Sequence, residues 1–147
     1  MLIGEFTSKL GEKNRTALPK KFRDEIGNDL IVAKGYDGCL ILVTKEQWTG
    51  ITKDMLVGPY TKEAVRDTGR FIMGSASEVD TDKQGRFVLP KTLTDYAAME
   101  NEVIFIGLMN RVEIWDAKKW RERSDYLAQN SSLIAEKLDS LGNTSEK

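Results

Sequence analysis

The apolar positions of this chain fall into two similar blocks, each with a pair of short and nearly continuous apolar runs. In the first block the runs are residues 30–33 and 39–43, and in the second they are residues 103–106 and 112–115. Such runs, rich in β-branched residues, are typical of strands covered on both faces. Since a glycine-containing segment separates the runs of each pair, we predict one buried hairpin in each block. Cys39 is expected to act there as a small buried hydrophobe.

A second pair of shorter strands, with alternating polar and apolar positions, is predicted before each buried hairpin. The predicted strands are residues 4–10 and 15–18, around a turn at 11–14, and residues 75–81 and 86–89, around a turn at 82–85. Asn14 and Gly85 occupy matching turn positions, and both residue types tolerate a positive φ. Because side chains alternate along a strand, Arg15 and Arg86 are expected to face away from the core.

Each of these outer strand pairs leads into a short helix that begins near a proline. Pro19 and Pro90 suit the first helical position, because their missing N–H costs nothing there. Lys20 and Lys91 then lie in the first turn, where the helix dipole disfavours a cation. Their recurrence at this position indicates phosphate contact, since the free N–H groups at a helix start also bind anions.

Longer helices are predicted after the buried hairpins. Thr44–Gln47 has the capping-box sequence, and residues 61–73 have an apolar side. The stretch after Trp120 has apolar residues at roughly helical spacing, so it can dock on the body of the protein or on a neighbouring subunit. Trp48 and Trp120 lie at equivalent places near the helix starts and are expected to anchor packing rather than to stack on bases.

The two blocks are copies of one unit. Residues 14–22 have the sequence NRTALPKKF, and residues 85–93 have the sequence GRFVLPKTL. The matched pairs include Arg15 with Arg86, Leu18 with Leu89, Pro19 with Pro90, Lys20 with Lys91, Gly35 with Gly107 and Trp48 with Trp120. We therefore divide the chain into a first repeat (1–60), a linking helix (61–73), a second repeat (74–128) and a C-terminal helix with a polar tail (129–147).

Composition indicates a globular protein without the side chains of most catalytic and metal sites. The 147 residues are 40% hydrophobic and 31% charged, which is typical of a folded domain. The chain has no histidine and one cysteine, so it lacks the commonest general base and metal ligand and cannot form an internal disulfide. Glycine-rich phosphate loops and nucleophile elbows are missing too. We therefore expect no enzyme, no metal, no cofactor and no small-molecule substrate.

The expected cellular compartment also follows from features that the sequence lacks. The longest apolar run, residues 103–109, is too short to span a membrane. The N-terminus lacks the basic start and long apolar stretch of a signal peptide, and a single cysteine suits a reducing compartment. We expect a cytoplasmic protein with no membrane partner.

The net charge of −1 conceals an excess of positive charge at the two outer turns. Between Lys9 and Arg23 six basic residues stand against one acidic residue, and between Asp82 and Lys91 three stand against one. Because charges farther apart than about 8–10 Å are screened, the local potential decides what a surface binds. Two basic turns at matching positions favour an anionic partner over solvated turns that are basic by chance. For one arginine, such as Arg86, the alternative is a surface pair with Asp82.

These segments resemble the MraZ family of bacterial regulators, encoded at the head of the division and cell-wall gene cluster. The resemblance covers about residues 1–128 and depends on two copies of an Asp-x-x-Gly-Arg turn that leads through Leu-Pro into a helix. The second copy, Asp82 to Arg86, matches in full, whereas the first, Gly11 to Arg15, lacks the aspartate and the glycine. The segments KGYDGCLIL, GSASEVDTDKQGR and NRVEIW are further landmarks.

The resemblance implies an α+β fold, a duplicated AbrB-like swapped-hairpin β-barrel with flanking short helices, whose two repeats form an intramolecular pseudo-dimer. It also implies a ring-like homo-oligomer, associated with the nucleoid, that binds double-stranded DNA at short direct repeats in a promoter and regulates transcription. The implied DNA-binding residues are Lys13, Arg15, Lys83 and Arg86, to which the charge pattern adds Lys20 and Lys91. The aspartate missing at Gly11 leaves two alternatives, a less well placed Arg15 or a more positive patch.

Two other functions compete with this interpretation. An oligomeric structural or interaction protein of the same fold would not bind DNA specifically, and gel filtration combined with a mobility shift separates the two. An RNA-binding role is disfavoured, because the basic turns have no interleaved aromatic residues.

Overall fold

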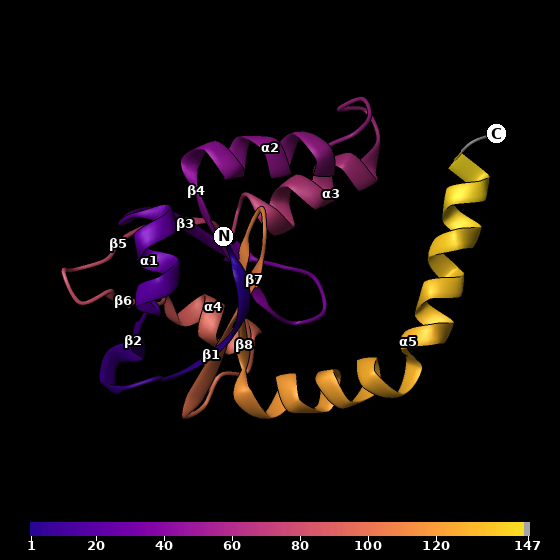
Figure 1. The fold of residues 1–147 in the computed structure, drawn as a ribbon. Helices are drawn as coiled ribbons and strands as arrows, with labels where there is room; N and C mark the ends of the chain where they lie inside the picture. Colours follow the sequence, from indigo (N-terminus) through magenta and orange to yellow (C-terminus); the bar gives the residue numbers. More distant parts are fainter. Residues whose placement is uncertain (146–147) are drawn as a thin grey trace. The chain divides into compact units, whose positions relative to one another are not determined.

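Both buried hairpins predicted from the apolar runs are present in the computed structural model, which describes residues 1–145 and the side chains of residues 1–142 (Figure 1). The strands are β1 (Ile3–Lys9), β2 (Arg15–Ala17), β3 (Asp29–Lys34), β4 (Leu40–Thr44), β5 (Ser77–Asp80), β6 (Arg86–Val88), β7 (Glu102–Leu108) and β8 (Val112–Asp116). The helices are η1 (Glu12–Asn14), α1 (Lys20–Ile26), α2 (Lys45–Met55), α3 (Glu63–Ile72), α4 (Lys91–Tyr96) and α5 (Ala117–Ser145). The buried hairpins are β3 with β4 and β7 with β8.

The two repeats exchange their first strands. All pairs in the six-stranded sheet are antiparallel, in the order β1-β7-β8-β4-β3-β5. Strand β1 of the first repeat pairs with β7, from Ile3 opposite Leu108 to Lys9 opposite Glu102, and β5 of the second repeat pairs with β3. Since β1, β3 and β4 are the repeat equivalents of β5, β7 and β8, the strand order is the same from either edge. The halves therefore interlock around an approximate two-fold axis.

The outer strands lie where the alternating pattern predicts them, but the expected pairing of β1 with β2 and of β5 with β6 is wrong. One backbone hydrogen bond closes each turn, from the Gly11 N–H to the Arg15 carbonyl (2.8 Å) and from the Asp82 N–H to the Arg86 carbonyl (3.0 Å). Beyond the first turn, β1 and β2 are hydrogen-bonded through the Ser8 hydroxyl, which accepts from the Thr16 hydroxyl (3.1 Å) and the Ala17 N–H (3.4 Å). Strand β2 forms its backbone ladder with β6 of the other repeat instead. An alternating pattern fixes which face of a strand is buried and leaves its partner open.

The expected closed β-barrel is also wrong for the residues that the structure describes. Strands β1 and β5 are the two edges of the main sheet, and β2 and β6 form a separate two-stranded ribbon. Because β1 does not pair with β2 and β5 does not pair with β6, the ribbon does not join the two edges by strand pairing and the main sheet stays open. Coarsely, the fold is α+β with antiparallel sheets, as expected.

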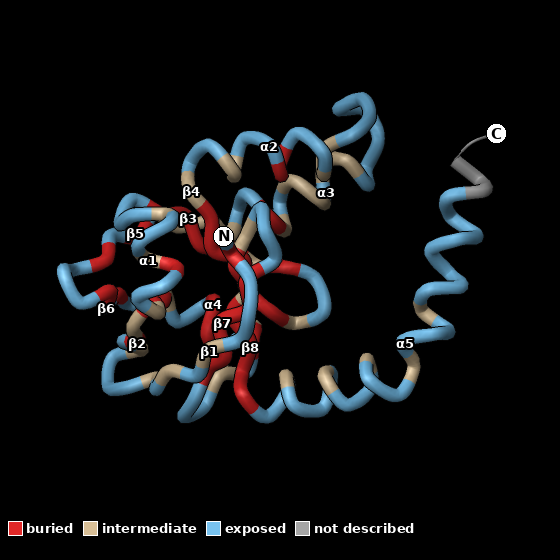
Figure 2. The backbone as a smooth tube through the Cα atoms, in the orientation of Figure 1, coloured by how far each residue is buried: buried red, intermediate tan, exposed pale blue. Residues whose placement is uncertain are grey.

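Both repeats contribute to one main core. Phe22, Leu89 and Phe105 are fully buried in it. Figure 2 shows that the buried stretches of the chain gather along the strands of the sheet. Phe87 and Phe105 pack edge to face, with ring centroids 6.4 Å apart. Burial at this level supplies most of the stabilisation of a domain of this size, so neither half retains its core without the other.

A smaller apolar cluster lies on the opposite face of the sheet. Trp48 of α2 packs against this cluster, which confirms the expected anchoring role of this tryptophan. The buried members of the cluster are Ile31, Ala33, Ile41, Val43 and Ile51. Cys39 is buried, also as expected. Burial, and secondarily the charge of Glu113, raises the pKa of the Cys39 thiol far above its ordinary value.

The helices marked by the capping box and by the two prolines are present, but the two that follow the prolines begin one residue later than predicted. The capping box of α2 is complete, because the Thr44 hydroxyl accepts from the Gln47 N–H (3.1 Å) and the Gln47 side chain accepts from the Thr44 N–H (3.0 Å). Pro19 and Pro90 are N-caps rather than first helical residues, so α1 and α4 begin at the lysines that follow. Both prolines have ψ of 140°, an extended value, which explains the shift by one residue.

The C-terminal helix α5, from Lys118 onward, belongs to a second compact unit, separate from the unit formed by residues 1–117. Its helical geometry is interrupted at Asn130 (φ −121°), whose side chain donates to the Tyr126 carbonyl. Tyr126, Leu133 and Leu138 are exposed on it. Across residues 1–145, no helix combines the length and the apolar character that a bilayer crossing requires.

Candidate nucleic-acid interface

The two arginines singled out from the repeat lie on one exposed face of the β2/β6 ribbon. Arg15 is opposite Val88 and Ala17 is opposite Arg86, and directly opposed residues share a face. The next pair, Thr16 opposite Phe87, points the other way and is buried. The ribbon is therefore anchored by one face and presents an arginine from each repeat on the other.

Each basic turn is held by the opposite repeat. The Asn14 carbonyl accepts a hydrogen bond from the Leu89 N–H (2.9 Å), and the Gly85 carbonyl accepts one from the Leu18 N–H (2.8 Å). The Arg23 guanidinium also donates to the Lys83 carbonyl (3.3 Å). Each turn is thus bonded to the chain segment that follows the ribbon strand of the other repeat, Leu89 for the first turn and Leu18 for the second.

The turn residues have the backbone geometry expected from their types. Gly85 has φ of 80° and Asn14 has φ of 58°, which confirms the predicted positive values. Lys13 also has a positive φ, 59°, so the first turn places two consecutive residues in the left-handed region. This second positive value was not predicted, because lysine carries no sequence signal for it.

Asp82 fixes both its own turn and Arg86. Its Oδ1 atom accepts from the N–H groups of Gln84 and Arg86, both at 2.9 Å, and its Oδ2 atom accepts from Arg86 Nε at 2.8 Å. Hydrogen bonds from the Arg86 backbone, and then from its side chain, hold the pKa of the Asp82 carboxyl below its ordinary value. The surface ion pair considered as the alternative role of Arg86 is therefore present.

Arg15 has no such brace. Gly11 stands where the second turn has Asp82, and the Arg15 guanidinium makes no hydrogen bond or ion pair with any described residue. Both arginines line a shallow hollow beside the ribbon, together with Glu78, Asp80 and Asp82. The surface is therefore mixed in charge, with the guanidinium groups at its exposed strand face.

The four lysines expected at the site fall into two classes. Lys20 is paired with Asp24 (2.9 Å) and Lys91 with Asp95 (2.7 Å), each one turn along its helix. Lys13 and Lys83 are exposed, and their ammonium groups have no partner among the described residues. Both ion pairs could have been found from the sequence, because each aspartate follows its lysine by four residues, which is the standard spacing of helical ion pairs.

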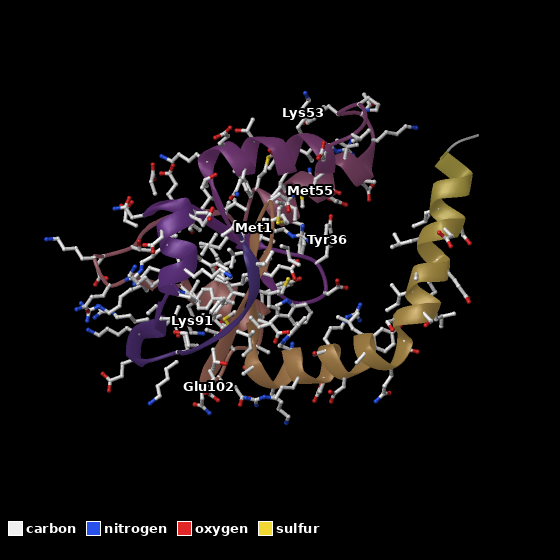
Figure 3. All side chains as sticks on the ribbon, in the orientation of Figure 1. Met1, Tyr36, Lys53, Met55, Lys91 and Glu102 are labelled. Carbon is white, nitrogen blue, oxygen red and sulfur yellow. The ribbon has the colours of Figure 1, made fainter. Side chains whose placement is uncertain are left out.

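The repeat predicts the positions of these residues one by one, and the strand exchange brings the two sets together. Side-chain nitrogens gather at the left of the view in Figure 3, where β2, β6 and α1 lie. Arg23 was not predicted as a site residue, although it contacts the second turn and lines a hollow with Lys20 and Lys83. Its only sequence signal was its place in the basic run.

Comparison with known proteins matches this duplicated architecture. The family model of the MraZ protein, described as antitoxin-like, matches the chain twice, over residues 1–71 and 72–140, which confirms the predicted duplication. A protein of Syntrophomonas wolfei named transcriptional regulator MraZ is 41% identical over 142 residues, covering 97% of this chain and 99% of the relative. Proteins of the same name from Acetivibrio thermocellus and Limosilactobacillus reuteri are 38% and 37% identical, and cover 97% and 95% of this chain.

Proposed function

Because this chain belongs to the MraZ family, we propose that it is a transcriptional regulator that binds double-stranded DNA through the exposed face of the β2/β6 ribbon. The relatives' names supply the regulatory role, and the ribbon supplies the contact surface. The family is one of regulators by name and not of enzymes, in keeping with a chain that lacks histidine.

The observation that carries the proposal is the placement of Arg15 and Arg86 on one face. The DNA major groove admits a two-stranded β-ribbon, and the planar arginine fork matches the acceptors of guanine. A ribbon anchored by Phe87 and Thr16 presents both guanidinium groups outward without further rearrangement of the backbone.

Lysines around the ribbon would contact the phosphates. Lys13 and Lys83 are exposed and unpaired among the described residues, and they lie in the two turns that flank the ribbon. Lys20 and Lys91 are exposed as well, and surface ion pairs such as theirs contribute so little that phosphates can displace the carboxylates.

The finer parts of the proposal concern assembly and target. The strand exchange supports the AbrB-like swapped-hairpin assignment, with residues 1–60 and 74–128 as the two repeats, 61–73 as the link and 129–147 as a C-terminal appendage. We propose a ring-like homo-oligomer, cytoplasmic and nucleoid-associated, that binds direct repeats in the promoter of the division and cell-wall gene cluster. A ring displays several ribbons, so repeated sites gain effective concentration without new contacts.

A footprint on the region upstream of the protein's own gene tests the proposal. Arg86→Ala should weaken binding to the protected site by about 1–3 kcal/mol and relax its base preference. Arg15→Ala should also weaken binding, whereas Arg70→Ala, which removes an exposed arginine of α3 paired with Asp67, should leave it unchanged. If the protein without both ribbon arginines protects its site as well as the unaltered protein does, the proposal is wrong.

The salt dependence tests the lysines separately. Lys20→Ala and Lys91→Ala should each weaken binding on all sequences and reduce the salt slope by about one. An unchanged slope in both variants would exclude these lysines as phosphate contacts. An assembled protein that shows no preference among DNA duplexes would instead support the alternative role as a structural protein.

A further inference from the structure

The two basic turns occupy equivalent positions and are built differently. The same backbone hydrogen bond closes both, from Gly11 to Arg15 in the first turn and from Asp82 to Arg86 in the second. Gly11 and Asp82 are therefore structural equivalents, and so are the two arginines. The turns differ in whether a carboxylate stands at the closing position, and in the backbone before the last turn residue, because Lys13 has a positive φ and Gln84 does not.

The carboxylate of Asp82 restricts Arg86 at three points. Two of its hydrogen bonds, from the N–H groups of Gln84 and Arg86, fix the backbone of the turn. The third, from Arg86 Nε, fixes the direction of the guanidinium and leaves its terminal nitrogens without a partner among the described residues. Since the pair is exposed, its main effect is to orient Arg86 rather than to stabilise the fold.

Arg15 keeps its rotamer freedom, because Gly11 offers no side chain to hold it. Contact with a base edge requires a guanidinium held at a fixed position and angle, since bidentate hydrogen bonds discriminate only in that geometry. Phosphate contacts impose no such requirement, because the backbone presents acceptors all along the groove and carries no base information.

We propose that the two turns divide the work of DNA binding: Asp82 is a positioning residue that fixes Arg86 for base-specific contact, whereas unbraced Arg15 makes sequence-tolerant contacts. This inference rests on the proposed DNA-binding function. It assigns specificity mainly to the second repeat, and it predicts that a brace built into the first repeat adds specificity.

The first turn has room for that brace. Gly11 has φ of −89° and ψ of −167°, an extended conformation that aspartate adopts without strain. A Cβ atom added there meets only the Arg15 carbonyl, at an ordinary contact distance of 3.6 Å. Gly11→Asp therefore places a carboxylate at the position equivalent to Asp82, and Asp82→Asn removes the charge there while keeping an oxygen for the turn N–H groups.

The test is selection from a randomised duplex DNA library, followed by binding to the selected site and to unselected duplex at several salt concentrations. Asp82→Asn should lower the ratio of specific to non-specific affinity about tenfold with an unchanged salt slope. Gly11→Asp should raise that ratio or extend the selected site. The matched control is Asp67→Asn, which removes another exposed carboxylate paired with an arginine and should change neither quantity.

The possible results separate the two proposals. If the unaltered protein selects no sequence, the proposed function fails. If it selects a site and Asp82→Asn keeps the same ratio, or loses affinity equally on all duplexes, the positioning role of Asp82 is overturned. Thermal unfolding shows whether Asp82→Asn is folded, and if it is not, Gly11→Asp decides, because an unchanged ratio in that variant overturns the division of roles.

Discussion

Gly85 is the residue on which the connection between the second turn and the first repeat depends most. It is buried, has φ of 80° and accepts the hydrogen bond from the Leu18 N–H. A Cβ atom at this position would lie 2.6 Å from the Leu18 carbonyl oxygen and 2.7 Å from Arg23 Cδ. Gly85→Ala therefore combines an unfavourable backbone conformation with a clash against the backbone of the other repeat.

Three costs add up to the expected effect. The left-handed conformation costs an alanine about 1 kcal/mol, and relief of the clash adds roughly 1–2 kcal/mol. Displacing Leu18 also weakens the hydrogen bond to the Gly85 carbonyl, which is worth about 1 kcal/mol. Since relaxation lets these contributions overlap, we expect Gly85→Ala to lower the free energy of unfolding by about 2–4 kcal/mol.

Urea unfolding at one fixed protein concentration measures this change, because the proposed assembly would make stability depend on concentration. Asn14→Gly is the matched control, since Asn14 holds the equivalent carbonyl and has φ of 58°. Glycine adopts that conformation without strain, so the control should stay within about 1 kcal/mol of the unaltered protein. Equal unfolding midpoints for Gly85→Ala and the unaltered protein would refute the inferred close contact between Gly85 and Leu18 of the first repeat.

The remaining predictions concern the strand exchange and two titrating groups. Gly107→Ala should lower the free energy of unfolding by about 1–3 kcal/mol in the same urea assay, because the added Cβ would lie 2.5 Å from backbone atoms of Leu2 and Ile3, where the exchanged strand β1 begins. Gly35→Ala, at the equivalent position of the first repeat, should cost less, since its Cβ would meet its nearest atoms at 3.1 Å. In an NMR titration the Asp82 carboxyl should have a pKa below the ordinary aspartate value, and Arg86→Ala should raise that pKa because it removes the side-chain hydrogen bond. The stability that Asp82 contributes is therefore present at neutral pH and is lost as the pH falls through the lowered pKa. Cys39 should resist alkylation at pH 8 in the folded protein and react once urea unfolds it, and rapid reaction of the native thiol would contradict its burial and raised pKa.

The buried hairpins were predictable because their signals are local. Each has two apolar runs and a turn within a short stretch of chain, and Thr44 with Gln47 marks the helix that follows the first. The partners of β1 and β5 were not predictable from the residues, because alternation fixes a face and not a neighbour. Only the family resemblance pointed to the exchange between halves, and it implied a barrel that the described strands do not close.

In the candidate site, too, the local features were predictable from the sequence and the long-range pairing was not. The exposure of Arg15 and Arg86 follows from alternation within each strand, and the repeat alone identified both as equivalent. Their common face depends on pairing between β2 and β6, which joins residues of different repeats. The pairing of Asp82 with Arg86 was foreseen from the sequence as an alternative role of the arginine, since an Asx turn of this kind involves only neighbouring residues.

The pairing of β1 with β7 also sets the order of events during synthesis. Ile3 must wait for Leu108 to leave the ribosome, a delay on the order of ten seconds at typical translation rates. Contacts so distant in sequence slow the folding of the released chain, and the unpaired strand is meanwhile open to the β7 of another nascent copy. Crowded polysomes should therefore yield intertwined dimers, in which two chains complete each other's sheets.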